Sequence, residues 1–169
     1  LSQEMIDRAR KHAPEFEFHI GNAEDPELLD SIVGPFDYII LSDMVGYLED
    51  CGNTFEMLRK LCTPKTRLVV AYYSHLWEPV VRLSERIGAK MPSMSQNWLS
   101  IDDTTNLLRL AGFEVVRQEW RQLMPKRLLG IGTVLNKVVA PLPGIRRFCL
   151  RNYVVARPVG LRETGTRQP

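Results

Sequence analysis

This sequence of 169 residues lacks several features that would by themselves identify the class of a protein. No apolar run approaches the roughly 18 residues that a membrane-spanning helix needs, so we expect no such span. The opening residues, LSQEMIDRARKHAPE, are polar and amphipathic, which is not typical of a signal peptide. These absences predict a cytoplasmic protein.

Cysteine is scarce, and its spacing excludes the common cysteine-based sites. The three cysteines, Cys51, Cys62 and Cys149, are odd in number and contain no C-x-x-C pair. Because cytosolic chains rarely carry disulfides, we expect three reduced thiols. Nothing in the sequence suggests a metal site.

What the sequence does contain is enough apolar material for one core, since 44% of the residues are hydrophobic and 25% are charged. The net charge of +2 hides an asymmetry: residues 1–116 carry a net charge of −7, and residues 117–169 carry +9. The basic end could face an acidic partner, such as a membrane surface, nucleic acid or another protein, or it could be solvated surface that balances the acidic part.

Helical and strand-like patterns alternate along the chain. The first helix has Ser2 at its N-cap position and stops at Pro14. Strands are predicted at 16–20, 36–41, 67–73, 113–120 and 152–156, and further helices at 27–33, 53–62, 79–87, 100–110 and 126–140. Such alternation predicts an α/β fold with a mostly parallel sheet and helices on both faces. The apolar runs at 36–41 and 67–73 predict central strands that are buried on both faces.

In open α/β sheets, ligands bind beyond the carboxyl ends of the strands. The segments that follow the predicted strands are therefore the places to look for a site. These segments are residues 21–25, 42–48 and 72–78.

Five segments, in this order, resemble the class I S-adenosylmethionine-dependent methyltransferases: LSQEMIDRAR, GNAEDPEL, FDYIILSDMVGYLED, RLVVAYYSHLWEP and the closing pair AGFEVV with NYVVARP. The resemblance covers residues 1–157 and implies a Rossmann-like fold whose last strand is antiparallel beside 113–120. It also implies S-adenosyl-L-methionine as the cofactor. The shorter segments LSDMVGYLED, YYSHLWEP and QNWLS are similar to methyltransferase domains found beside bacterial glycosyltransferase domains.

The sequence departs from this family in one respect. The family's first strand, its glycine-rich loop and the acidic residue for the ribose hydroxyls are absent; Gly130 and Gly132 have a G-x-G spacing, but no strand precedes them. We therefore expect an N-terminally truncated methyltransferase domain over residues 1–157, itself inactive, and a disordered tail over 158–169.

The resemblance implies which residues contact the cofactor. The turn after the second family strand would lie against the adenine, where a side-chain acceptor and a backbone N–H meet the ring; the family often has Asp where this chain has Asn22. Met5 could pack on the adenine or belong to the core. The strand end after Phe36-Asp37 would meet the methionine part. The expected cofactor residues are Ser2, Met5, Asn22, Ala23, Glu24, Ser42 and Met44.

A general base is needed only if the methyl acceptor is a hydroxyl or a protonated amine. His75 is the first candidate, because it follows the strand at 67–73 and a free imidazole titrates near neutral pH; the alternative is a surface histidine without chemistry. Asp43 and Tyr47 are further catalytic candidates, and Tyr73 and Glu78 lie in the same segments. His12 and His19 are expected to be structural, while Trp77 and Trp98 could line an acceptor pocket or belong to the core.

Three functions remain open. The first is methyl transfer to a small-molecule acceptor, such as a sugar or lipid-linked hydroxyl. The second is a non-catalytic binding module on the same fold. The third is a nucleic-acid methyltransferase, which is disfavoured because Ser42-Asp43-Met44-Val45 replaces the Asn/Asp-Pro-Pro-aromatic motif of many such enzymes.

The basic, apolar segment 126–151 is longer than a connection between two strands requires. It could form a lid or acceptor-binding element, dock on an adjacent glycosyltransferase domain, or rest on an anionic membrane surface. It could also pack on the sheet as additional core.

Overall fold

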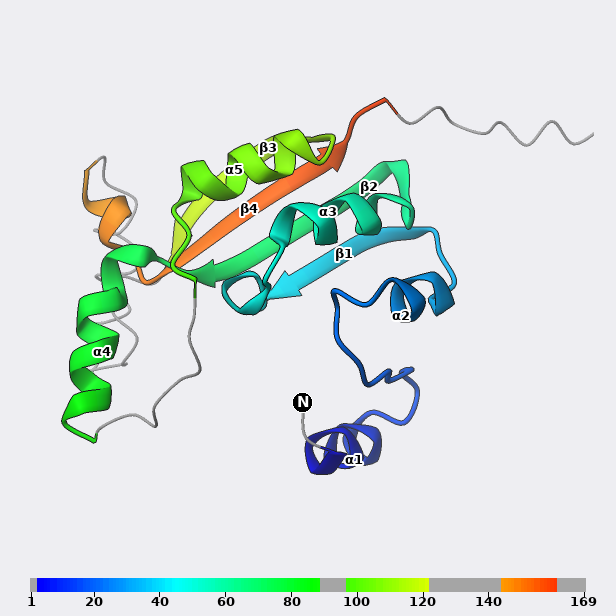
Figure 1. Cartoon of the computed structure of the whole chain (residues 1–169), viewed down its shortest axis with the longest axis horizontal. Coiled ribbons are helices and arrows are strands. Elements are labelled where there is room, and N and C mark those ends of the chain that lie inside the picture. Colours follow the sequence, from blue (N-terminus) through cyan, green and yellow to red (C-terminus); the bar gives the residue numbers. More distant parts are fainter. Residues whose placement is uncertain (1–2, 89–96, 122–143, 161–169) are drawn as a thin grey trace, which may run out of the picture. The chain divides into compact units, whose positions relative to one another are not determined.

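The computed structural model describes residues 3–88, 97–121 and 144–160 (Figure 1). The chain divides into two compact units, residues 1–33 and residues 34–169. No helix within the described ranges is both long and apolar enough to cross a membrane.

The first unit contains two helices, α1 (Gln3–His12) and α2 (Pro26–Ser31). Both begin and end where local chemistry favours it. Basic residues close the last turn of α1, where the helix dipole favours positive charge. Asp25 caps α2 by accepting the N–H of Glu27 at 3.0 Å, and Pro26 occupies the first turn. Ile6 and Leu29 are the buried apolar side chains of these helices.

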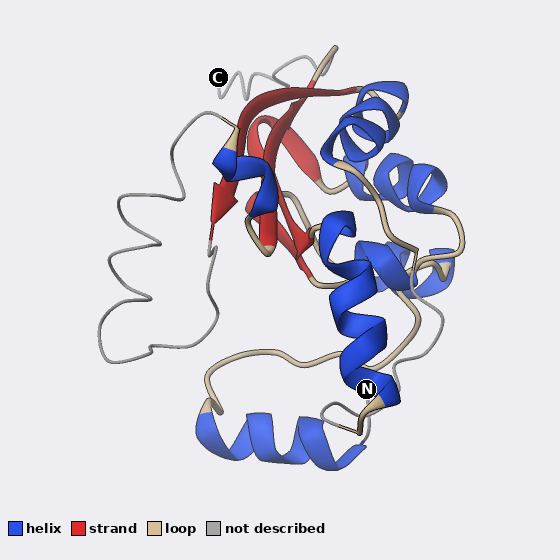
Figure 2. Cartoon of the chain, turned by 90° about the vertical axis from the view of Figure 1, so that its left-hand side faces the viewer, coloured by secondary structure: helices blue, strands red, loops and turns tan. Residues whose placement is uncertain are grey.

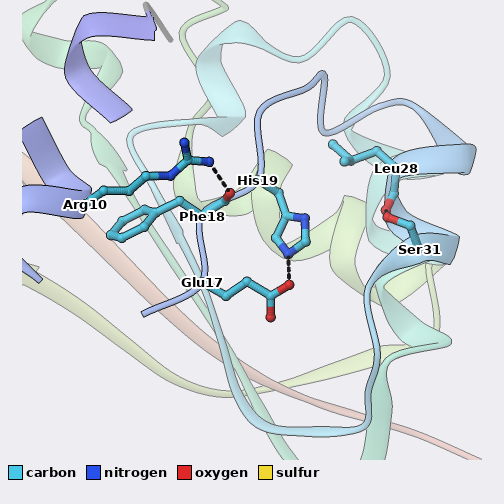
Figure 3. Close-up of polar contacts among 6 residues, drawn as sticks. All are labelled: Arg10, Glu17, Phe18, His19, Leu28 and Ser31. Atoms are coloured by element: carbon cyan, nitrogen blue, oxygen red, sulfur yellow. Dashed lines mark hydrogen bonds and ion pairs between the residues drawn. The ribbon is translucent and has the colours of Figure 1, made fainter. Parts of the chain in front are cut away.

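The strand predicted at residues 16–20 is wrong, because this segment is irregular in the structure. Phe16 and Ile20 are 65% and 46% exposed, so neither side chain anchors the segment in a core. A strand needs a neighbour to satisfy its backbone, and no described strand of the first unit provides one. Side chains hold the segment instead: Arg10 donates to the Phe18 carbonyl at 3.3 Å, and His19 contacts Glu17 at 2.9 Å (Figure 3).

The second unit contains a mixed sheet with the strand order β1-β2-β4-β3 (Figure 1). Strand β1 (Phe36–Ser42) pairs in parallel with β2 (Cys62–Tyr73). Strand β4 (Arg151–Pro158) lies between β2 and β3 (Phe113–Arg121) and is antiparallel to both. The Rossmann-like α/β fold, the parallel pair and the antiparallel last strand are therefore confirmed. Figure 2 shows this sheet and its twist from the side.

Helices α3 (Cys51–Arg59) and α5 (Ile101–Leu110) cover one face of the sheet (Figure 1). Successive side chains of a strand point to opposite faces, so every second residue of β2 and β4 faces these helices. The side chains of Leu68, Val70 and Val154 are fully buried there, and Phe55 of α3 also has no exposed surface. This interface is the core of the second unit.

The expectation that residues 36–41 form a central strand is wrong for the described sheet, in which β1 is an edge strand. Leu41 is only 6% exposed, whereas Tyr38 and Ile40 are 68% and 67% exposed. The difference follows from strand geometry, because Leu41 lies on the face that α3 and α5 cover and the other two lie on the opposite face.

Side chains cap the starts of α3 and α5. Asp50 accepts the N–H of Asn53 at 2.9 Å, so α3 begins at Cys51, two residues earlier than predicted, while Cys62 belongs to β2. A short helix, η1 (Val45–Tyr47), follows β1, and η2 (His75–Trp77) leads from β2 into α4 (Glu78–Arg86). Ser100 and Asp103 form a capping box at the start of α5.

Several predictions fall on residues outside the described ranges. These are the N-cap Ser2, most of the loop at 88–96, the helix at 126–140 and most of the tail at 158–169. Of the segment 126–151, the structure describes residues 144–151, which contain the short helix η4 (Ile145–Phe148). The lid, docking and membrane hypotheses for this segment remain predictions.

Candidate functional site

The carboxyl ends of the parallel strands β1 and β2 lie side by side, as their register pairs Ser42 with Ala71. Strand β4 enters the sheet at the same edge, because its first residue, Arg151, pairs with Tyr73 at the end of β2. The end of β3 lies here as well, because Arg121 also pairs with Arg151, so four strand ends meet at this place. The predicted segments 42–48 and 72–78 both belong to this edge.

An ion pair joins these strand ends. Asp43 has a positive φ of 54°, an uncommon conformation for a residue with a side chain. Its N–H donates to the Ala71 carbonyl at 2.8 Å, and its Oδ2 accepts from Arg151 Nη2 at 2.7 Å. The same nitrogen donates to the Tyr73 hydroxyl at 3.2 Å, and the guanidinium lies 4.8 Å from the Tyr73 ring centre. This cluster fixes the strand ends relative to one another.

The cluster also limits what Asp43 can do. Its Oδ2 is occupied by Arg151, and its Oδ1 is buried without a hydrogen-bond partner among the described residues. Hydrogen bonding to Tyr73 raises the pKa of Arg151 above its ordinary value, with a smaller contribution from Asp43. Asp43 is thus placed to position the strand ends.

A cavity of about 530 Å³ lies at the same ends of the strands, a volume within the range of small-molecule sites. Its wall comes from five elements: the end of β2 with η2, the start of α5, the end of β3, the start of β4, and η4. The lining residues are Ser74, His75, Leu76, Ser100, Ile101, Asp102, Gln118, Trp120, Phe148 and Asn152.

Asn152 and Tyr72 form the buried polar floor of this region. Asn152 is 2% exposed, and its Oδ1 has no hydrogen-bond partner among the described residues. Tyr72 donates its hydroxyl proton to the Ser100 carbonyl at 3.2 Å. Burial raises the pKa of Tyr72 to about 12, partly offset by hydrogen bonds from Thr104 and Asn152. The phenol therefore stays protonated at neutral pH.

Backbone and indole contacts hold the cavity's outer wall. Trp77 Nε1 donates to the Phe148 carbonyl at 2.8 Å, and the Ser74 N–H donates to the Leu150 carbonyl at the same distance. These bonds tie η2 to the segment that leads into β4. Trp77 thus supports the cavity from outside, whereas Trp120 of β3 lines it.

The structure brings some predicted residues together and separates others. His75 is exposed and lines the cavity, while Asp43 and Tyr73 share Arg151. Tyr47 is 50% exposed on η1 and does not line the cavity. Glu78 forms an ion pair with Arg82 of the next helical turn at 2.5 Å. His75 is the predicted base that the geometry places best.

Ser42 ends β1 and is exposed, and Met44 is half-buried just beyond it. The roles of these two residues, like those of the first-unit residues, remain predictions. Trp98, which was expected either to line an acceptor pocket or to belong to the core, is half-buried and is not among the residues that line the cavity.

In the first unit, the side chain and carbonyl of Asn22 stabilise the turn at residues 21–25. Asn22 Oδ1 accepts the N–H of Glu24 at 3.1 Å, and the Asn22 carbonyl accepts the N–H of Asp25 at 3.0 Å. No hydrogen bond between described residues uses the N–H of Ala23. Met5 is 57% exposed on α1, so its side chain lies outside the buried core of this unit.

The remaining histidines and cysteines have structural contacts. His12 Nδ1 lies 2.9 Å from the Arg8 carbonyl one helical turn earlier. Cys51 donates to the Val45 carbonyl and Cys62 to the Leu58 carbonyl, each at 3.3 Å, and no disulfide joins the three described cysteines. The described parts of the chain hold no group of three residues that could bind a metal ion.

Sequence reasoning missed Asn152, Gln118 and Trp120 as cavity residues. They come from the last two strands, which are far from His75 in the sequence, and no motif spacing connects them. The sequence does contain an indication for Asn152. It is a polar residue in the apolar strand NYVVA, on the same face as Val154 and Ala156, which are fully buried.

Comparison of the sequence with known protein families gives a match over most of the chain. A family model described as a methyltransferase domain matches residues 1–118. No curated protein matches the chain.

Solved structures share the fold. An S-adenosylmethionine-dependent methyltransferase from Mesorhizobium loti is 17% identical with a TM-score of 0.63, and the match covers 93% of this chain and 77% of that one. One from Clostridium acetobutylicum is 11% identical with a TM-score of 0.60, covering 94% and 72%. Magnesium protoporphyrin IX methyltransferase from Synechocystis, solved with bound S-adenosylhomocysteine, is 16% identical with a TM-score of 0.55, covering 92% and 60%.

Proposed function

Because the chain belongs to the methyltransferase domain family, we propose that it transfers a methyl group from S-adenosyl-L-methionine to a hydroxyl group of a small-molecule acceptor. The observation that carries this proposal is the cavity at the carboxyl end of β2, which His75 lines. Ligands of open α/β sheets bind at this edge. A histidine beside a cavity of this size is placed to act on a bound molecule.

The residues of the first unit fit the cofactor's adenine. The uncommitted N–H of Ala23 is a donor for a ring nitrogen, and Asn22 Oδ1 has a second lone pair beyond the one that binds Glu24. Ser42 and Met44 are the proposed contacts of the methionine part, and Ser2, Met5 and Glu24 complete the set. When bound, S-adenosylmethionine supplies a methyl group on a positively charged sulfur.

The protein's own contribution is alignment and removal of a proton. Methyl transfer is an in-line displacement, so holding the acceptor in one orientation supplies much of the rate. The Asp43–Arg151–Tyr73 cluster fixes the strand ends on which the site is built. His75 accepts the proton of the acceptor hydroxyl as its oxygen attacks.

Two other functions are less well supported. A nucleic-acid substrate needs positive charge for its phosphates, and none of the described residues that line the cavity is Lys or Arg. A non-catalytic binding module would bind the same molecules without transferring a methyl group, so a transfer assay separates it from the enzyme.

The cofactor assignment is tested by calorimetry with S-adenosylmethionine and S-adenosylhomocysteine on the natural polypeptide that carries this sequence. We expect Asn22→Ala to weaken binding about tenfold, the value of one hydrogen bond. Asn22→Asp keeps the acceptor and should bind within about threefold of the unchanged protein. Failure of the unchanged protein to bind either molecule would overturn the proposed function.

The role of His75 is tested by following S-adenosylhomocysteine formation with neutral glycosides and polyols as acceptors. Loss of a general base costs about 10²- to 10⁴-fold in rate, so we expect His75→Gln to lower turnover by that factor and to leave cofactor affinity unchanged. His12→Gln, a change of the same kind on the exposed side of α1, is the control. Equal turnover by the His75 variant would remove this residue from the mechanism.

A further inference from the structure

The cavity beside His75, at the carboxyl end of β2, is lined by neutral polar side chains and by apolar ones. Its polar groups are mostly neutral amides and hydroxyls, from Ser74, Ser100, Gln118 and Asn152. Among the described lining residues, Asp102, at the acidic start of α5, supplies the one carboxylate, and none is Lys or Arg. A bound anion would meet this carboxylate without a Lys or Arg from the described part of the wall, so this part of the lining favours a neutral ligand.

Apolar side chains line the same cavity. Trp120 of β3 is half-buried, and Ile101 and Leu76 add aliphatic surface. Aromatic and aliphatic groups around a few fixed polar atoms are the usual composition of a small-molecule site. A ring with an apolar face and hydroxyl groups at its edge matches this wall.

One acceptor atom in the wall lacks a partner. Asn152 is buried and lies opposite Tyr72 in the pairing of β4 with β2, and Tyr72 uses its own proton on the Ser100 carbonyl. The phenol therefore offers no donor to Asn152 Oδ1, which has no hydrogen-bond partner among the described residues. Native proteins rarely leave a buried acceptor unsatisfied, and a ligand donor is one way to satisfy it.

We infer that this cavity binds a neutral, hydroxylated ring compound, whose hydroxyl donates a hydrogen bond to Asn152 Oδ1 and whose apolar face lies against Trp120. Asn152 is thereby the residue that selects a hydrogen-bond donor. The inference rests on the proposed function only in identifying the bound molecule as the methyl acceptor, because the binding itself requires no cofactor.

The test uses the natural polypeptide labelled with ¹⁵N. The probes are the neutral methyl glycosides of glucose, galactose, mannose and rhamnose, each compared with a glycoside that carries a carboxylate, methyl glucuronide. We expect at least one neutral glycoside to shift the Trp120 indole and Asn152 amide signals in a saturable manner and to bind at least tenfold more tightly than the glucuronide. The inference is overturned if no neutral probe shifts these signals, or if the glucuronide binds equally well.

Asn152→Leu separates ligand recognition from a structural role. The variant replaces a buried side chain, whose oxygen has no partner among the described residues, by an apolar one of similar size, so we expect a melting temperature within about 2 °C of the unchanged protein and a loss of glycoside binding of at least tenfold. Asn106→Leu, on the exposed side of α5, is the matched control and should retain binding. A lower melting temperature with unchanged binding would make Asn152 a structural residue and overturn its assignment.

A second variant covers the case in which leucine disturbs folding at position 152. Trp120→Leu keeps an apolar side chain in the wall but removes the flat surface, and it should also weaken glycoside binding at least tenfold. Calorimetry with S-adenosylmethionine on the same samples separates the two proposals. Cofactor binding without glycoside binding overturns the present inference alone, whereas glycoside binding without cofactor binding overturns the proposed function alone.

Discussion

Tyr72 shows how a single residue connects the core to the site. Its ring belongs to the buried face of β2, and its hydroxyl donates to the Ser100 carbonyl at the start of α5. Because the phenolate form would be buried, desolvation raises the pKa of Tyr72 to about 12. The neutral phenol therefore contributes to stability as well as to the wall behind the cavity.

This raised pKa predicts a stability change at high pH. A group that holds its proton more tightly in the folded state stabilises the fold below its unfolded pKa, near 10, and loses that contribution as the pH rises through the folded pKa, near 12. We expect the free energy of unfolding to fall by about 2–3 kcal/mol between these values, measured by urea denaturation. Tyr72→Phe should abolish most of this decrease.

The Cys62 thiol titrates in the same range and is the necessary control. Burial raises its pKa from 9.0 to about 11, so it loses its stabilising contribution as the pH rises through this range. Cys62→Ser should remove only the part of the decrease that begins near pH 9. A Tyr72→Phe variant whose stability falls as steeply as that of the unchanged protein would contradict the assignment to Tyr72.

At the level of single site residues, the sequence identified those that directly follow strands. His75 and Asp43 could be predicted because strand ends mark the ligand edge of an α/β sheet. Arg151, Asn152 and Trp120 could not, because the contact of Arg151 with Asp43 and the place of the other two beside His75 depend on the insertion of β4 between β2 and β3. Sequence position carries no information about that neighbourhood until the strand order is known.

Helix α5 shows how one element is bounded by local chemistry. The Ser100–Asp103 capping box starts it, and hydrogen bonds from Ser100 lower the pKa of Asp103. It ends before Gly112, whose φ of 79° is strained for any residue with a side chain. A Cβ at Gly112 would also lie 3.1 Å from the Arg59 guanidinium, which donates to the Val159 carbonyl.

Gly112→Ala is therefore expected to destabilise the protein through both strain and crowding. The left-handed conformation alone costs about 1–2 kcal/mol for a residue with a Cβ. Gly88→Ala is a matched control, because Gly88 has a φ of 71° with no atom within 4 Å of its Cβ position. Urea denaturation should show a larger loss for Gly112→Ala; equal losses would mean that the Arg59 side chain moves aside without penalty.

Elements bounded by such local signals were predictable from the sequence, and those that depend on neighbours were not. The helices around 3–12 and 101–110 were predicted to within a few residues, because the charge pattern of the first and the Ser100 cap of the second are encoded in adjacent residues. The strand expected at 16–20 is wrong, since alternating apolar residues do not create a strand without a partner. The apolar run of β1 likewise indicated a strand correctly but could not indicate that it lies at an edge.

At the scale of the whole molecule, burial is unevenly divided between the two units. The described helices of residues 1–33 bury Ile6 and Leu29, whereas the second unit buries Phe55, Phe113 and the inner residues of β2 and β4. Segments with few buried apolar contacts open at lower free energy than the global unfolding reaction. The two units should therefore differ in local stability.

Amide hydrogen exchange measured by NMR should reveal this difference. We expect the slowest exchange at residues 68–72 and 152–156, because β2 and β4 have hydrogen-bonded neighbours on both sides. Amides of α1 should exchange faster by at least tenfold, which corresponds to about 1.4 kcal/mol in opening free energy. Equal protection of α1 and β4 would show that the first unit is as stable as the sheet.

The strand order has a consequence for the time at which the site forms during synthesis. Strand β4, the last described strand in the sequence, fills the position between β2 and β3, and it also brings Arg151 to Asp43 and Asn152 to the cavity. On the ribosome, β1, β2 and β3 are made first. The position between β2 and β3 stays unfilled until residues 151–158 emerge. A translation product that stops before Arg151 therefore lacks both the ion pair with Asp43 and the cavity residue Asn152, so the proposed acceptor site is complete only after residues 151–158 have been added.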